Sequence, residues 1–327
     1  MSKALLTVRD LAVHFPVSRG LWGGTAMLRA VDGVSFAVAA GESLGVVGES
    51  GCGKSTLARA VLRLIPATAG AVIWLGEDLA GVSARQMRAA RRGLQIVFQD
   101  PLASLDPRMT IGASIGEPLE VFEPGLDRAA RARRVRAMME RVGLAPDMIN
   151  RYPHEISGGQ GQRVGIARAM ILAPKLVICD EAVSALDVSI QAQIIALLRD
   201  LQAEFGLSLL FISHDLAVVR QLCQRVMVLY LGKVMEIGAA GAIFTAPRHP
   251  YTRALLAATP VPDPLVERNK PLAVLAGDPP SPLLPPSGCV FRTRCAHVGP
   301  RCARDIPDLS EAGEGRQAAC HYWRELS

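Results

Sequence analysis

The sequence of 327 residues lacks any long hydrophobic run. No apolar stretch approaches the roughly 18 residues that a helix needs to span a bilayer. Residues 1–10 also lack the succession of basic, apolar and small residues that marks a secretory signal. We therefore expect the chain to stay in the cytoplasm, where it can still lie against a membrane.

Aromatic residues are scarce as well, at 5% of the chain. The formal net charge of +6 permits binding to nucleic acid, but no aromatic stacking platform accompanies it. Much of the positive charge lies in two arginine clusters, at residues 85–92 and 128–136. The second cluster has the pattern of a solvated helix face, with attraction to anionic lipid head groups as the alternative. We expect no nucleic-acid partner.

A glycine-rich loop is the most informative feature that is present. Residues 48–56 match G-x-x-x-x-G-K-[ST], between an apolar run at 43–47 and a segment with helical apolar spacing. Glycines let backbone amides approach phosphate oxygens closely, and a helix N-terminus favours negative charge. The lysine then reaches the β- and γ-phosphates, and the hydroxyl after it is placed to bind Mg²⁺. The pattern predicts a nucleoside triphosphate site at Gly48, Glu49, Ser50, Gly51, Cys52, Gly53, Lys54, Ser55 and Thr56.

The N-terminal part of the chain has the pattern of a β-sheet. Residues 5–47 alternate apolar and polar side chains and predict antiparallel strands around a glycine-rich excursion at 20–24. Another strand is expected at 70–75. A section at about 100–172 is mostly helical and carries most of the arginine.

Two later segments are continuous apolar runs, at 175–179 and 208–212. Such runs are typical of parallel strands covered on both faces. A helix at about 188–205 supplies the crossover between them. Half of the 22 prolines then lie between residues 247 and 286, which predicts a connector followed by a small terminal module.

Two further motifs carry chemistry. Asp180 and Glu181 end the first buried run, where one carboxylate can hold Mg²⁺ and the next can orient or deprotonate an attacking water. The segment Ser157-Gly158-Gly159-Gln160 opens a helix with a hydroxyl and bare amides, which is a second anion-binding pattern.

The three motifs, in this order, resemble those of ATP-binding-cassette (ABC) ATPases. In that family two cassettes pack head to tail, and the Ser-Gly-Gly-Gln of one closes over ATP on the other. The resemblance implies that ATP and Mg²⁺ are the cofactors, with the metal on Ser55, Gln99 and Asp180.

The same resemblance implies roles for further residues. Glu181, Gln99 and His214 would be catalytic: Gln99 matches the glutamine that senses the metal and the water, and His214 matches the switch histidine near the γ-phosphate. Taken alone, a histidine at a strand end is more often structural. Besides the glycine-rich loop, the implied nucleotide contacts are Phe15, stacking on adenine, with Asp180, Ser157, Gly158, Gly159, Gln160 and the dimer-interface residue Asp187.

Residues 97–109 and 180–189 resemble the oligopeptide/dipeptide importer branch of this family, in which Ala182-Val183 replaces the common Pro-Thr or Pro-Ser. One departure is Gly161, which stands where arginine is common. The implied fold is α/β: a P-loop NTPase-type cassette with a mixed sheet core, an antiparallel β subdomain and a helical subdomain at about 100–172. Residues 1–260 would form this domain, and residues 261–327 the connector and a cysteine-containing C-terminal module.

The implied function is ATP hydrolysis that powers peptide import from the cytoplasmic face of the inner membrane. The implied partners are a second cassette (identical or a paralogue), two transmembrane permease subunits and an extracytoplasmic substrate-binding protein. Two alternatives stay open: import of another small solute such as nickel, and a non-transport ABC ATPase.

Four cysteines near the C-terminus, Cys289, Cys295, Cys302 and Cys320, lie beyond the connector. In a reducing compartment we expect no disulfides between them. By spacing alone, a 4Fe–4S cluster, zinc and unliganded thiols are equal alternatives. The resemblance to peptide importer cassettes favours the cluster.

Overall fold

The computed structural model describes residues 4–18, 24–184, 186–259, 268 and 277–326. Most of the predicted excursion at 20–24 and most of the predicted connector lie outside these residues, as does Ala185 next to the predicted interface residue Asp187. The chain forms two compact units. The first unit comprises residues 1–5, 38–42 and 81–213, and the second comprises residues 6–37, 43–80 and 214–327.

The first unit contains three parallel strands and most of the helices. Its elements are α2 (Ala84–Gly93), β6 (Leu94–Val97), α3 (Ile111–Phe122), α4 (Arg128–Arg141), the 3-10 helices η2 (Pro146–Asn150) and η3 (Pro153–Glu155), α5 (Gly158–Met170), β7 (Leu176–Asp180), α6 (Val188–Phe205) and β8 (Ser208–Ile212). β7 lies between β6 and β8 and pairs in parallel with both, and every residue of β7 and β8 is buried. The expected parallel strands and their crossover helix are thus confirmed.

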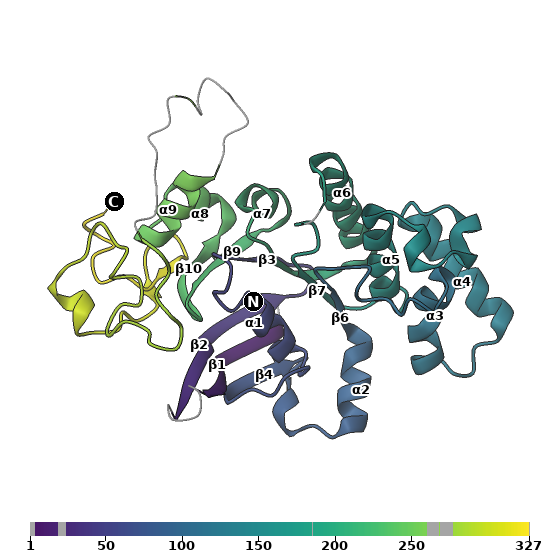
Figure 1. The fold of residues 1–327 in the computed structure, drawn as a ribbon, viewed down its shortest axis with the longest axis horizontal. Helices are drawn as coiled ribbons and strands as arrows, with labels where there is room; N and C mark the ends of the chain where they lie inside the picture. The colour runs from purple at the N-terminus through teal and green to yellow at the C-terminus, as the bar shows by residue number, and fades with distance from the viewer. Residues whose placement is uncertain (1–3, 19–23, 185, 260–267, 269–276, 327) are drawn as a thin grey trace. The chain divides into compact units, whose positions relative to one another are not determined.

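The helices of the first unit begin at side chains that cap them. Asp127 accepts from the amide of Ala130 at the start of α4, and Asp187 does the same for Ile190 at α6. Such caps satisfy amides that have no partner inside the helix. α6 ends at Gly206, whose φ of 62° is the left-handed conformation common after helices. The predicted helical section is confirmed, and α3 packs against α4 and α5 (Figure 1).

The second unit contains two sheets. Its elements are β1 (Ala4–Ser18, whose first two residues belong to the first unit), β2 (Thr25–Ala39, whose last two residues belong to the first unit), β3 (Ser43–Val47), α1 (Lys54–Val61), β4 (Ala69–Trp74), β5 (Glu77–Asp78), the 3-10 helix η1 (Leu79–Gly81, whose last residue belongs to the first unit), α7 (Leu216–Leu222), β9 (Arg225–Tyr230), β10 (Lys233–Ala239), α8 (Ala240–Thr245), α9 (Pro250–Ala258), η4 (Pro300–Ala303), β11 (Ser310–Glu311) and β12 (Gln317–Ala318).

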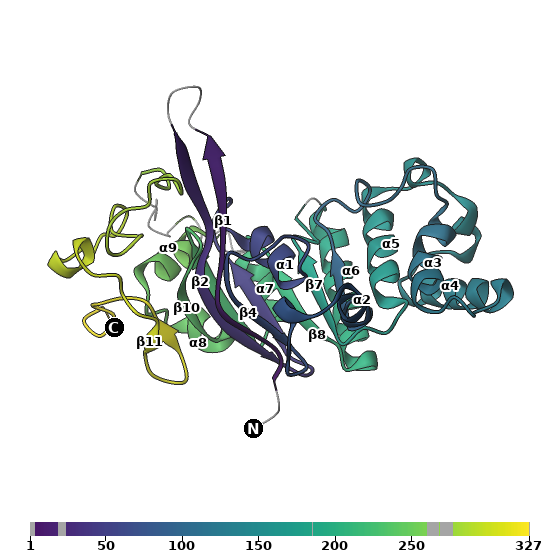
Figure 2. The ribbon, with the colours of Figure 1, turned by 90° about the horizontal axis from the view of Figure 1, so that it is seen from below.

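One sheet of the second unit has the order β2-β1-β4-β5, and its long strands run side by side in Figure 2. β4 pairs antiparallel with β1 and confirms the strand expected at 70–75. The expectation that residues 43–47 belong to this antiparallel group is wrong, because β3 pairs in parallel with β9. The reason is burial: all five β3 residues are buried, as in strands covered on both faces.

The other sheet of the second unit is mixed. β9 pairs antiparallel with β10. The other side of β10 pairs antiparallel with β12, which belongs to the terminal segment, residues 277–326. The last strands of the chain therefore extend the row of strands formed by β3, β9 and β10. The predicted division between residues 1–260 and 261–327 stays a prediction. Among the described residues, each helix is too short or too polar to cross a membrane.

A buried histidine joins β10, α9 and the terminal segment. Glu236 on β10 is fully buried and accepts hydrogen bonds from the backbone amides of Arg248 and His249. His249 caps α9, where its Nδ1 accepts from the amide of Tyr251 at 3.0 Å. Burial lowers the pKa of His249 to about 3, although a backbone hydrogen bond with Ala319 opposes the shift. The ring is therefore neutral in the folded protein.

We predict that this histidine makes the protein sensitive to acid. The unfolded chain takes up a proton near pH 6.5 and the folded chain only near pH 3, so stability falls as the pH drops between these values. His249→Asn keeps an acceptor for the cap but cannot titrate. Urea unfolding from pH 6.5 to 4 should show a slope against pH that is shallower in the variant by about 1.4 kcal/mol per unit. Equal slopes would contradict a neutral buried His249.

Candidate nucleotide site

The glycine-rich loop joins β3 to α1 and is pressed against neighbouring backbone. A Cβ on Gly48 would lie 2.1 Å from the carbonyl oxygen of Leu229, and a Cβ on Gly53 would lie 2.0 Å from that of Ala30. Gly53 also has a φ of +105°, a conformation that side chains disfavour. Glycine is thus required at both positions by close approach of other strands.

Lys54 lies inside this loop. Its side chain is 4% exposed, and its Nζ donates to the carbonyl oxygens of Gly48 at 2.8 Å and Glu49 at 3.0 Å. Burial raises the pKa of the neighbouring Cys52 thiol, against the opposing effect of Lys54. Cys52 is therefore a packed, protonated side chain, and the lysine is the cation that the loop encloses.

The loop is tied to the rest of the second unit at Glu49. The Glu49 amide, one of the predicted phosphate-facing groups, donates to the hydroxyl of Tyr251 at 2.9 Å. The Glu49 carboxylate accepts two hydrogen bonds from Arg294, at 2.6 and 3.0 Å. The amide of Gly232, in the turn between β9 and β10, donates to the carbonyl of Cys52. Arg294 from near the C-terminus, Tyr251 from α9 and Gly232 from the turn after β9 thus contact the loop directly.

Two other predicted residues belong to the second unit. Phe15 lies on β1 with 36% of its surface exposed, so a flat ligand can reach its ring. The adjacent His14 forms a hydrogen bond instead, with its Nε2 3.2 Å from Asp32 Oδ1. His214 is exposed and follows β8 in the chain.

The first unit brings together Gln99 and Glu181. β6 and β7 pair in register, so the residues after their carboxyl ends come close to each other. Gln99 Nε2 donates to Glu181 Oε2 at 2.9 Å. Glu181 has a φ of +49°, and its amide donates to the carbonyl of Ile212 on β8. Asp180, the last residue of β7, is 1% exposed.

The Ser-Gly-Gly-Gln segment forms the start of α5. Ser157 caps the helix and makes a reciprocal capping box with Gln160, while Ser157 and Gly158 are exposed. Gly159 packs against α6, where an added Cβ would lie 2.8 Å from Ile190. Asp187 caps α6, and the Ser189 hydroxyl lowers the pKa of its carboxyl group. Both helix starts are therefore preformed by their own side chains.

The four terminal cysteines do not form a ligand set. Among the described residues, no group of three or more His, Cys, Asp or Glu side chains is placed to hold a metal ion. Cys289 and Cys302 are buried, and Cys295 and Cys320 are partly exposed. Burial raises the pKa of Cys289 to about 11, with the other three cysteines adding to the shift. The thiols lie in one region, but the iron–sulfur and zinc alternatives have no structural support.

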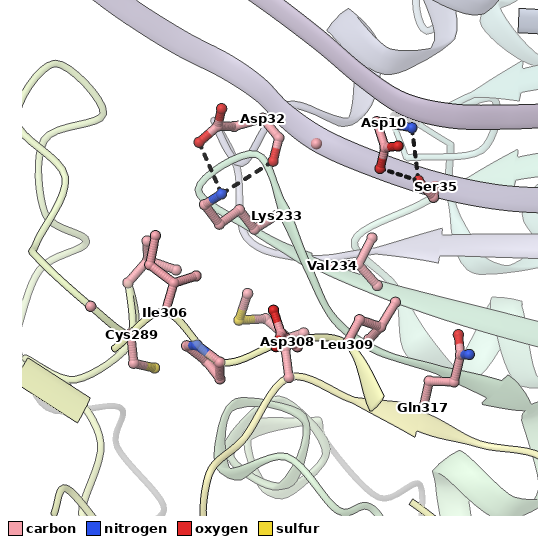
Figure 3. Close-up of a pocket in the computed structure, with 16 residues that line it drawn as sticks. Asp10, Asp32, Ser35, Lys233, Val234, Cys289, Ile306, Asp308, Leu309 and Gln317 are labelled. Carbon is pink, nitrogen blue, oxygen red and sulfur yellow. Dashed lines mark hydrogen bonds and ion pairs between the residues drawn. The ribbon is translucent and has the colours of Figure 1, made fainter. Parts of the chain in front are cut away.

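A cavity of about 450 Å³ in the second unit lies outside these motifs. It is lined by residues of β1, β2, β10 and the terminal segment. Figure 3 shows Lys233 bonded to Asp32, at 2.9 Å from Oδ2, and Ser35 bonded to Asp10. The lysine and aspartate neutralise each other, so this cavity lacks the concentrated positive charge that a triphosphate needs.

Comparisons with known proteins agree with the motifs. The sequence profile of the ABC transporter family matches residues 31–184, and the profile described as the C-terminal region of oligopeptide/dipeptide transporters matches residues 235–302. The oligopeptide transport ATP-binding protein OppF of Salmonella typhimurium is 58% identical over 94% of this chain and 93% of its own length. The chain belongs to the ABC transporter family. It is accordingly an ATP-binding protein and an ATP hydrolase.

Other ABC proteins show the same likeness. OppF of Haemophilus influenzae is 54% identical over 97% of this chain and 96% of its own length. Among solved structures, the cassette MJ0796 bound to ADP and Pi is 25% identical with a TM-score of 0.64, over 72% of this chain and 98% of that one. Cassette cbiO1 of Clostridium perfringens is 25% identical with a TM-score of 0.63, over 75% and 92%. The predicted family and α/β cassette fold are confirmed.

Sequence reasoning missed the residues that hold the glycine-rich loop from outside. Arg294 and Tyr251 follow Glu49 by 245 and 202 residues, and neither belongs to a motif with regular spacing. Nor could its residue type identify Arg294 as a buried contact, since arginine side chains are usually exposed. Only the folded chain reveals these contacts.

We predict that the two loop glycines Gly53 and Gly51 differ in their tolerance to alanine. At Gly53 the added Cβ would overlap a carbonyl oxygen, whereas at Gly51, with a φ of +78°, it meets nothing within 4 Å. Gly51→Ala should cost about 1 kcal/mol of unfolding free energy, from backbone strain alone. Gly53→Ala should cost about 3 kcal/mol or more, because strain and overlap add. Urea unfolding measures both, and equal losses would contradict the close packing.

Proposed function

We propose that this chain is the ATP-binding and ATP-hydrolysing subunit that powers import of oligopeptides or dipeptides. The observation that carries the substrate class is the match of residues 235–302 to the C-terminal region of oligopeptide/dipeptide transporters. The similarity to OppF over nearly the whole of both chains supports it. Residues 1–260 act as the ATPase domain and residues 261–327 as a connector and terminal module in this proposal.

The second unit binds the triphosphate. The loop from Gly48 to Thr56 surrounds the phosphates, and Lys54 supplies the cation from inside it. The exposed ring of Phe15 stacks on adenine. His214, exposed after β8, contacts the γ-phosphate.

The first unit acts on the attacking water. Glu181 accepts the proton of the water, and Gln99 holds the carboxylate in place through its 2.9 Å hydrogen bond. The oxygens of Ser55, Gln99 and Asp180 are the hard donors that Mg²⁺ prefers. A bound Mg²⁺ would neutralise charge on the phosphates.

A second cassette completes the site in this proposal. The exposed residues Ser157 and Gly158, with Gly159 and Gln160, contact ATP held by the partner, and Asp187 lies at that interface. The preformed capping box of α5 supports this, since its first amides keep a fixed direction without a ligand. Closing and reopening of the pair then couples hydrolysis to movement.

The further partners are two permease subunits in the membrane and an extracytoplasmic substrate-binding protein. The chain then lies peripherally on the cytoplasmic face of the inner membrane. We include no iron–sulfur cluster, because no ligand set exists among the described residues. Iron, sulfide and zinc analysis of anaerobically purified protein would decide that question independently.

We predict that Glu181→Gln binds ATP but hydrolyses it at least about a hundredfold more slowly, because the amide cannot accept the proton. The variant should accumulate as an ATP-bound dimer, measured by gel filtration and by single-turnover hydrolysis. Glu204→Gln is a matched control, since this exposed α6 carboxylate pairs with a surface arginine, Arg141, in the first unit. Full turnover by Glu181→Gln would remove Glu181 from the reaction.

We also predict which cargo activates the complex. With its permeases and binding protein in proteoliposomes, the wild-type chain should couple ATP hydrolysis to uptake of labelled di- and oligopeptides. Glu181→Gln should abolish both activities. Uptake of nickel but not peptides would favour the metal importer, and ATP hydrolysis without any membrane partner in pull-downs would favour a non-transport ATPase.

A further inference from the structure

The terminal segment reaches the glycine-rich loop through a buried arginine. Arg294 has 5% of its side chain exposed, and its two Nη atoms bind both carboxylate oxygens of Glu49. Such two-pronged pairs between arginine and carboxylate are geometrically specific and stronger than neutral hydrogen bonds. Both residues belong to the second unit.

The position of Arg294 is set by an aromatic cluster. Its neighbour Phe291 is 2% exposed and packs edge-on to Tyr230, with ring centroids 5.3 Å apart, and 5.2 Å from Tyr251. Tyr230 and Tyr251 themselves lie 4.7 Å apart. The guanidinium of Arg294 lies over the Tyr230 ring at 5.9 Å. The segment that carries Arg294 is thus anchored beside the loop before any ligand binds.

The same cluster fixes the other side of Glu49. The Tyr251 hydroxyl accepts from the Glu49 amide, while the Glu49 carbonyl accepts from Lys54 Nζ. The amide, the carbonyl and the carboxylate of Glu49 are therefore all hydrogen-bonded. Tyr251 binds the amide and Arg294 binds the carboxylate. The backbone that places Lys54 depends on how Glu49 is held.

Charge makes this contact matter for the nucleotide. Glu49 brings a carboxylate, 24% exposed, to the loop that must receive a triphosphate. An unpaired carboxylate there repels the phosphates, and low local polarity strengthens the repulsion. Arg294 neutralises that charge and directs the carboxylate towards the terminal segment.

We propose that Arg294 is a positioning residue for ATP binding, through which the C-terminal segment sets the nucleotide affinity of the glycine-rich loop. The inference rests on the ATP site proposed above. It goes further by giving the terminal segment a role in the ATPase itself. Arg294 acts through Glu49 and does not contact the nucleotide.

The test measures affinity of the purified full-length chain for a fluorescent ATP analogue. Arg294→Met should weaken binding about tenfold, the cost of leaving a hydrogen-bonded charge unpaired. The loss should be smaller for the ADP analogue and should shrink as salt is raised, because repulsion between charges is screened. Arg301→Met is the control, since the exposed side chain of Arg301 pairs with Asp305 in the same segment.

A double variant separates positioning from a merely structural role. Adding Glu49→Gln to Arg294→Met removes the unpaired charge, so affinity should return to within about threefold of wild type. Arg294→Lys, which keeps one charged contact, should fall between wild type and Arg294→Met. In the assembled transporter, KM for ATP should rise in Arg294→Met while kcat changes little.

The outcomes are distinct. Arg294→Met with wild-type affinity, or a double variant as weak as Arg294→Met alone, would overturn the proposal. If Arg294→Met does not fold, an Arg294→Lys variant with wild-type affinity and no altered salt dependence would overturn it as well. Failure of the wild-type chain to bind ATP would instead contradict the proposed function.

Discussion

Close approach of backbone to backbone at the glycine-rich loop is the constraint on which the second unit depends. Carbonyl oxygens of β2 and β9 occupy the space that side chains at Gly53 and Gly48 would need. The strands come this near because β3, which leads into the loop, pairs with β9 in the buried mixed sheet. The loop that receives phosphate is therefore shaped by elements distant in sequence as much as by its own glycines.

In the first unit, it is the register of the parallel strands that brings the candidate residues together. Parallel pairing of β6 with β7, and of β7 with β8, brings the ends of three strands to one edge. Gln99 and Glu181 meet there, and the Ile212 carbonyl fixes the Glu181 backbone in an unusual conformation. Strained backbone conformations that neighbouring residues stabilise are common where a side chain must keep a fixed orientation. The glycine-rich loop and the Gln99–Glu181 pair thus rest on different structural features.

Sequence reasoning succeeded where the signal is local. The span of α6 and the buried runs of β7 and β8 follow from neighbouring residues. It failed where the partner is remote. The parallel pairing of β3, the addition of β12 to β10 and the ion pair at Glu49 depend on residues about 180 or more positions away, or on the chain's last strands. Cysteine spacing likewise said nothing about how the thiols would be arranged.

The ion pair between Glu49 and Arg294 also imposes an order in time. A ribosome adds about 5 to 20 residues per second. The 245 positions between the two partners therefore correspond to on the order of 10 to 50 seconds of synthesis. Throughout that interval the nascent loop carries its carboxylate without the guanidinium that neutralises it. The contacts of the glycine-rich loop are complete only when the ribosome has nearly finished, so a prematurely terminated chain leaves translation without the guanidinium that holds Glu49.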